Sequence, residues 1–239
     1  MPATGRRIAV AGVDGCPKGW IAALRIPATG ETGVTIADSF ASLLDGPVAS
    51  ALMIAVDMPI GLPEVPGRAC ERETRAAIGP RRSSVFSSPL RGMLAFEAYE
   101  DANAFGRARG AGLSRQAWAI TPKIREIDAL MTPALQARVI EGHPEFAFAR
   151  LGGEPCAFAK RKREGHDERI AILGKHGVDA RALIREARRR FPFKRIFADD
   201  DLIDACALAL TAGAGLSGAA WRAGDSARDA RGLKMEIWG

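Results

Sequence analysis

Two aspartates follow apolar segments of this 239-residue chain in a way that could place their carboxylates together. Asp14 follows the apolar run at 7–13, and Asp57 ends the run that begins at Ala51. Buried carboxylates held close together repel each other unless a cation lies between them, and Mg²⁺ or Mn²⁺ takes oxygen ligands. A structural role is the alternative, because Asp-Gly is common turn chemistry. That alternative is weaker for Asp57, since no glycine or serine follows it.

A third group of acids lies in the segment 198–212, which the sequence predicts to be a helix. Asp201 and Asp204 are three residues apart and therefore share a face of that helix. Asp199 or Asp200 is expected at the N-cap, where acids gain from the helix dipole. Asp204 precedes a nearly all-apolar run, and a buried acid without a partner is costly. A metal ion held by the other aspartates would supply that partner.

The fourth acidic stretch is EGHPE, residues 141–145. Glu141 is expected at the end of a strand, and Glu145 in the first turn of the following helix. Either glutamate could complete a metal site, and both also fit helix-start positions. His143 fits a catalytic or substrate-binding role as well as it fits a loop residue with a local hydrogen bond.

The elements that would position these residues form an α/β pattern. Strands are predicted at 7–13, 20–26 and 33–38, at the apolar run before Asp57, and at 137–142. A short helix follows the third strand with Asp38 or Ser39 as its N-cap. The region 64–136 is mainly helical, and helices continue after Pro144 and from 166 onward, with stops at 174–177 and after Thr211. No assignment is made for the tail after 216.

This order of elements is that of a ribonuclease H-like fold: a mixed five-stranded sheet flanked by helices. The region 64–136 is then a helical insertion in a single domain spanning 1–239. The long apolar strand before Asp57 fits a position in the parallel part of the sheet, where strands are buried on both faces.

Composition narrows the classes of function. The net charge is +6 and the pI about 9.5, with basic clusters at 79–84, 160–169 and 185–195. Such clusters are solvated surfaces by default, and phosphate-binding surfaces in the less common case.

The sequence also bears on localisation. It contains no run of about 20 apolar residues, so a membrane span is not expected. The N-terminus does not resemble a secretory signal. Four widely spaced cysteines fit reduced thiols rather than a zinc site or disulfides. A cytoplasmic protein with no membrane partner is expected.

Four motifs together resemble the DUF429 family, predicted nucleases of the ribonuclease H-like superfamily. They occur in order between about residues 8 and 212: GVDGCPKGW, AVDMPIGLP, EGHPEFAF and DDLIDACALALTA. The resemblance implies metal ligands Asp14 on the first strand, Asp57 on the fourth, and Asp204 with Asp201 on the last helix. Ribonucleases H place a glutamate on the first helix, where this chain has none. Glu141 or Glu145 is the candidate replacement, and the fourth ligand stays open.

The leading hypothesis is a nuclease that hydrolyses phosphodiester bonds of nucleic acid with two Mg²⁺ or Mn²⁺ ions. Asp14, Asp57, Asp204, Glu141 and Glu145 are the candidate catalytic acids. Candidate substrate-binding residues share a polar or basic side chain near these acids: Lys18, Arg81, Arg82, Ser83, Ser84 and His143.

Two other functions stay open. One is a nucleotide phosphohydrolase that uses the DGCPKGW turn as a phosphate loop, and the other is a non-catalytic nucleic-acid-binding module. Neither DNA nor RNA is favoured, and the oligomeric state, a homodimer included, is not determined by the sequence.

Overall fold

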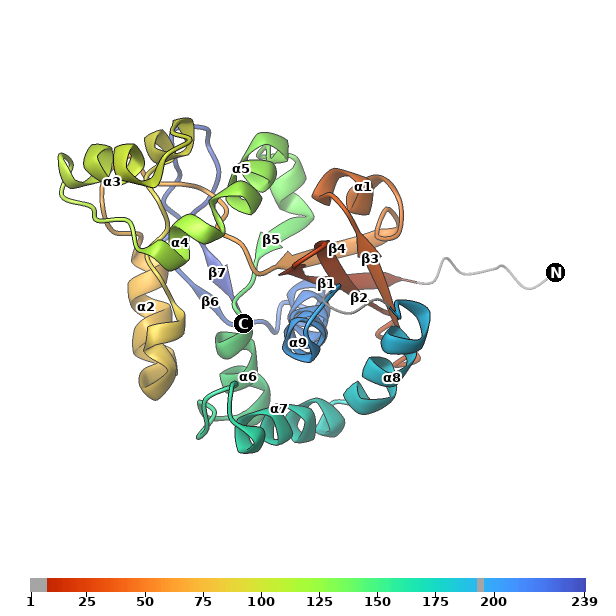
Figure 1. The fold of residues 1–239 in the computed structure, drawn as a ribbon. Helices are drawn as coiled ribbons and strands as arrows, with labels where there is room; N and C mark the ends of the chain where they lie inside the picture. Colours follow the sequence, from red (N-terminus) through yellow and green to blue (C-terminus); the bar gives the residue numbers. More distant parts are fainter. Residues whose placement is uncertain (1–7, 193–195) are drawn as a thin grey trace.

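The computed structural model describes residues 8–192 and 196–239. The predicted start of the first strand at residue 7 and the end of the basic cluster at 193–195 lie outside the described residues. A mixed sheet has the order β3-β2-β1-β4-β5 (Figure 1). Its strands are β1 (Ala9–Cys16), β2 (Gly19–Arg25), β3 (Thr32–Ala37), β4 (Ala51–Val56) and β5 (Val139–Glu141).

The first three strands pair antiparallel, and β1, β4 and β5 run parallel to one another. This is the α/β arrangement predicted from the sequence, and it is consistent with a ribonuclease H-like fold. Each predicted strand is present, with ends shifted by up to a few residues. The largest shift affects β1, which continues through Asp14 to Cys16 and does not end at residue 13. The hairpin turn is only Pro17–Lys18, because Asp14 pairs with Ile21 and Cys16 with Gly19.

Side-chain alternation along the strands separates two apolar layers. Val10, Ala55 and Ile140 point toward one layer of helices. These helices are α6 (Pro144–Gly152), α7 (Arg163–Lys175), α8 (Ala180–Arg190) and α9 (Asp199–Leu216), which lie together below the sheet in Figure 1. Ala11, Val13, Ile54 and Val56 point the other way. That face is covered by α1 (Phe40–Asp45), capped by Ser39, and by α5 (Thr121–Leu130).

Helix α9 lies directly against the middle of β1 because Gly12 has no side chain. A Cβ atom at Gly12 would be 2.0 Å from the Ala205 carbonyl oxygen and 2.2 Å from the Ala209 nitrogen. The contact fixes the N-terminal half of α9 over the end of β1. Helix α9 begins after Ala198, not at the predicted Asp199 or Asp200 cap, and it ends at Leu216 rather than after Thr211. Beyond Thr211, Ala212 is still buried and a Cβ at Gly215 would lie 2.5 Å from Met53 Sδ, whereas Leu216 is exposed.

The predicted helical insertion lies beside the β4–β5 edge in Figure 1. Its elements are α2 (Ala69–Ile78), η1 (Gly79–Ser84), η2 (Arg91–Ala95), α3 (Tyr99–Arg107), α4 (Arg115–Ala119), α5 and η3 (Leu135–Ala137). Arg91 ties the insertion to the C-terminal segment. Its guanidinium donates to both Asp128 oxygens at 2.6 Å and pairs with buried Asp229.

The tail that the sequence left unassigned forms a short antiparallel pair, β6 (Arg222–Ala223) and β7 (Ile237–Trp238). All four cysteines are buried free thiols. In the described part of the chain, no helix is both long and apolar enough to span a membrane.

Candidate carboxylate site

The position of Asp14 follows from the alternation of β1. Asp14 is two residues beyond Gly12, so its side chain leaves the sheet on the face that α9 covers. The parallel pairing of β1 with β4 ends at Val13 and Val56. Asp14 thus lies just past that ladder, although it remains inside the antiparallel ladder with β2. Its side chain is 9% exposed, and its Oδ1 accepts a hydrogen bond from the Gly15 nitrogen.

Asp57 reaches the same face from β4. Ala55 packs toward α9, and Asp57 is two residues further along the chain. The Asp57 nitrogen donates to the Val13 carbonyl at 3.0 Å, which continues the strand pairing by one bond. The end of the parallel ladder therefore places Asp14 and Asp57 on adjacent strands at the same height.

Asp204 comes from α9, one residue before the Ala205 carbonyl that touches Gly12. It is 1% exposed, and its Oδ2 accepts a hydrogen bond from Lys160 Nζ at 2.8 Å. Its other oxygen, Oδ1, is buried and has no hydrogen-bond partner among the described residues. An ionised carboxylate with an unsatisfied buried oxygen retains the capacity to bind a cation.

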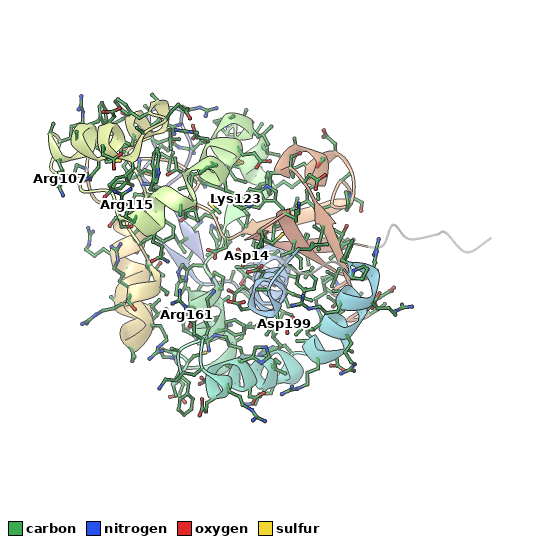
Figure 2. All side chains as sticks on the ribbon, viewed as in Figure 1. Asp14, Arg107, Arg115, Lys123, Arg161 and Asp199 are labelled. Atoms are coloured by element: carbon green, nitrogen blue, oxygen red, sulfur yellow. The ribbon has the colours of Figure 1, made fainter. Side chains whose placement is uncertain are left out.

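The three aspartates line one pocket of about 450 Å³. Its wall also has basic and polar side chains from several elements: Arg81, Ser83, Ser84, Gln116, Lys123, His143, Lys160 and Arg161. Figure 2 shows Asp14 near the centre of the molecule, with Lys123 and Arg161 on opposite sides of it. The pocket therefore combines an acidic floor with cationic walls, a charge pattern suited to a cation and a phosphate together.

Burial and mutual repulsion raise the pKa values of the three acids. Burial raises the pKa of Asp14 well above its usual range, and Asp57 and Asp204 raise it further. Burial, with the charge of Asp204, raises the pKa of Asp57 to about 7. Burial also raises the pKa of Asp204, although Lys160 opposes that change. The acids are close enough to interact, and the one lysine does not fully compensate their charge.

Glu141 lies on the wrong side of the sheet to join them. It pairs in register with Val56, so its side chain leaves the face opposite Asp14 and Asp57. There the Arg68 guanidinium donates to both carboxylate oxygens, and the Ile60 nitrogen donates to Oε2 at 2.8 Å. Glu141 is therefore bound in a buried ion pair outside the pocket.

Glu145 does line the pocket, but it is already neutralised. It lies in the first turn of α6, where Arg169 Nη2 donates to its two oxygens at 2.5 and 2.7 Å. His143 is the N-cap of that helix, and burial lowers its pKa to about 4. At neutral pH His143 is therefore an uncharged hydrogen-bonding group in the pocket wall.

The remaining predicted residues divide between the pocket and its surroundings. Arg81, Ser83 and Ser84 line the pocket, whereas Lys18 and Arg82 are exposed and do not. Asp201 also lies outside the lining, because its Oδ2 accepts from the Ala198 nitrogen at 2.8 Å and caps α9.

Sequence reasoning missed three cationic groups of the pocket as individual residues. Lys160 and Arg161 belong to the 160–169 basic cluster, but nothing in the sequence connects Lys160 with Asp204. Lys123 reaches the site over Gly15, where a Cβ would lie 2.7 Å from Lys123 Cδ, and its ammonium donates to the Gly19 carbonyl. The absence of a side chain at Gly15 is the only sequence signal for that contact.

The donor set was tested for a divalent metal. In residues 8–192 and 196–239, no group of three or more His, Cys, Asp and Glu side chains is gathered tightly enough to hold a metal ion by itself. The chemistry of the donors nevertheless fits, because Asp14, Asp57 and the unpartnered Oδ1 of Asp204 are hard oxygen ligands facing one pocket.

Comparison with known proteins identifies the family. The family model described as "Protein of unknown function (DUF429)" matches residues 12–228. The chain therefore belongs to the DUF429 family. No curated protein and no solved structure matches it.

Proposed function

We propose that this DUF429 protein is a divalent-metal-dependent nuclease that hydrolyses phosphodiester bonds in nucleic acid. The observation that carries the proposal is the meeting of Asp14, Asp57 and Asp204 in one pocket. They come from two parallel strands and a helix, and each has a pKa raised by burial. A cluster of this kind is expensive for the fold, and a bound cation would offset its cost.

The chain's own residues would bind and orient the substrate. Arg81 has a buried Nε without a hydrogen-bond partner in the described residues, and it lines the pocket with Ser83 and Ser84. Such side chains bind the phosphates of nucleic acid and fix its position without reading sequence. Arg161 and Lys123 provide further positive charge on the opposite walls.

A divalent ion, when bound, would activate a water for attack on phosphorus and stabilise the charge on the leaving oxygen. In the hydrolysis, water adds to phosphorus, the bond to the 3′-oxygen breaks, and that oxygen takes up a proton. The cation would be held by Asp14, Asp57 and Asp204. The wall that carries Arg81 would orient the phosphate for attack by water. His143, neutral at pH 7, donates or accepts a hydrogen bond at the pocket wall.

The phosphate-loop alternative has less support than the nuclease. Asp14, Gly15 and Cys16 belong to β1, and the β1–β2 turn is two residues long. Lys18 in that turn is exposed and lies outside the pocket lining. A loop that binds the phosphates of a nucleoside triphosphate donates several main-chain N–H groups to them. A two-residue hairpin turn has few such free groups.

The test compares cleavage of circular single-stranded DNA, duplex DNA and folded RNA with Mg²⁺, Mn²⁺ or EDTA. We expect metal-dependent cleavage of at least one substrate, reduced on the order of 100-fold or more by Asp14→Asn. Arg81→Ala should weaken cleavage, whereas Arg82→Ala, one residue away but outside the pocket, should change it little.

Hydrolysis of ATP without strand cleavage would favour the phosphohydrolase alternative. Metal-independent binding of nucleic acid without cleavage would favour the binding module. Cleavage that Asp14→Asn leaves intact would contradict the proposed site.

A further inference from the structure

The Lys160 side chain is 42% exposed, but its ammonium is engaged at the carboxylate site. Its Nζ lies 2.8 Å from Asp204 Oδ2 and 3.7 Å from Asp200 Oδ2, at the edge of the pocket. The Asp204 carboxylate is only 2% exposed, so the Lys160 ammonium is paired with a buried acid. The charge of Asp204 outweighs the cost of burying the ammonium and raises the pKa of Lys160.

The loop that carries Lys160, between α6 and α7, is fastened to the first turns of α7. The Glu168 carboxylate accepts from the nitrogens of Ala157 and Phe158 at 2.7 and 3.0 Å. Arg169 donates to the Phe158 carbonyl at 3.1 Å. Gly165 touches the same loop, since a Cβ there would be 2.1 Å from the Ala159 oxygen. These contacts fix the main chain on the N-terminal side of Lys160.

We propose that the Lys160 ammonium takes the place of a second metal ion, so that the site binds one divalent cation and not two. This inference rests on the proposed function. Asp14, Asp57 and the unpartnered Oδ1 of Asp204 would hold the single ion, and Oδ2 of Asp204 would keep its hydrogen bond from Lys160.

Charge balance supports one ion. Asp14, Asp57 and Asp204 carry three negative charges when ionised, and one ammonium with one divalent cation carries three positive charges. A second divalent ion would compete with the ammonium for Asp204 and would add positive charge to a pocket that Arg81, Lys123 and Arg161 already line. Of the other acids in the neighbourhood, Glu145 pairs with Arg169 and Asp201 caps the helix N-terminus. Asp200 lies 3.7 Å from Lys160, but its side chain is 40% exposed, so solvent screens its charge.

Lys160 also has a role toward the substrate. It lines the same pocket as Arg81 and Arg161, so a phosphate bound there lies within the field of the ammonium. The positive charge stabilises negative charge that develops on phosphoryl oxygens as water attacks. Lys160 is then both the partner of Asp204 and a second, fixed source of positive charge for the reaction.

The experiment counts Mn²⁺ ions bound per chain, by calorimetry and by the free-Mn²⁺ resonance signal. Each titration is done with the metal alone and with a phosphorothioate oligonucleotide that resists cleavage. The variants are Lys160→Met, Lys160→Arg and Lys162→Met. Lys162 is an exposed lysine two residues away with no ion pair among the described residues, so its replacement removes the same charge outside the pocket.

We expect one Mn²⁺ for wild type, Lys160→Arg and Lys162→Met, and two for Lys160→Met, whose circular dichroism should be unchanged. Asp14→Asn should lose the ion in the wild-type background. Two ions per wild-type chain, or one in Lys160→Met, would overturn the lysine inference and leave the metal-dependent nuclease proposal standing. No ion bound by wild type, with or without the oligonucleotide, would overturn both.

Discussion

Replacing Asp57 with asparagine should stabilise the metal-free protein at alkaline pH. The pKa of Asp57 is raised from 3.8 to about 7, first by burial and then by the charge of Asp204. A shift of this size corresponds to at most about 4 kcal/mol of destabilisation when the carboxylate is ionised. Asp57 is partly exposed, so solvent reduces this penalty, and a net gain of about 1–3 kcal/mol is expected for Asp57→Asn at pH 8.

The dependence on pH has a definite sign. Below pH 3.8 the carboxyl group is protonated in both the folded and the unfolded chain, and it carries no electrostatic penalty. Between pH 3.8 and about 7 the folded chain keeps a proton that the unfolded chain has released. Stability therefore falls as pH rises through that window, and the full penalty is present above it. Asparagine does not ionise, so the advantage of the variant grows over the same range.

Urea unfolding in EDTA at pH 4.5 and pH 8 measures this effect. Up to about 3 kcal/mol of the penalty arises between these two pH values, so the variant's gain must be larger at pH 8. Asp179→Asn is the matched control: Asp179 is exposed and caps α8, and asparagine caps equally well. Adding Mn²⁺ should narrow the gap, because only the wild type retains all three carboxylates for the ion.

Either of two results would refute the reasoning. An equal change in stability at the two pH values would mean that the Asp57 charge is not the cause. A variant less stable than wild type at pH 8 would mean that the carboxylate makes a favourable contact in the metal-free fold.

Two further changes test the framework of the site. Gly12→Ala should lower the free energy of unfolding by about 3 kcal/mol or more and push α9 away from β1, because the new Cβ would overlap the Ala205 carbonyl. The urea concentration at the unfolding midpoint should fall, and Mn²⁺ should bind more weakly. An unchanged urea midpoint would contradict the close packing of α9 on β1. Arg169→Met should cost about 3–5 kcal/mol by leaving Glu145 buried without a partner. Adding Glu145→Gln should recover part of that loss of stability. If the changes in unfolding free energy of the two single variants simply added in the double variant, the pairing would be contradicted.

The part of the site that the sequence predicts depends on local pattern alone. The apolar run before Asp57 predicts both the strand and the position of the aspartate at its end. A continuous apolar run indicates a strand that is buried on both faces. The apolar residues after Asp204 likewise indicate a buried helix, so its acid must face a partner. These inferences need no knowledge of which residues meet, only of which residues are buried.

Glu141 shows where pattern stops being sufficient. The sequence places it at the end of β5, and the structure agrees. The face on which it points depends on register, and alternation sends adjacent residues of a strand to opposite faces. Ile140 of β5 points toward α9, and the next residue on that face is Gly142, just after the strand, where a Cβ would lie 2.5 Å from Leu208 Cδ2 of α9.

Lys160 could not be predicted for a different reason. Its partner lies 44 residues away, and four consecutive basic residues, Lys160 to Arg163, are chemically similar candidates. The packing of their loop on α7 determines which of them reaches Asp204. The Glu168 carboxylate binds that loop, and the loop approaches closely where Gly165 has no side chain. Because that docking fixes the main chain just before Lys160, the first basic residue of the run meets Asp204, and the third remains in solvent. The identity of the site's cation is therefore a property of tertiary packing, even though every residue that determines it is visible in the sequence.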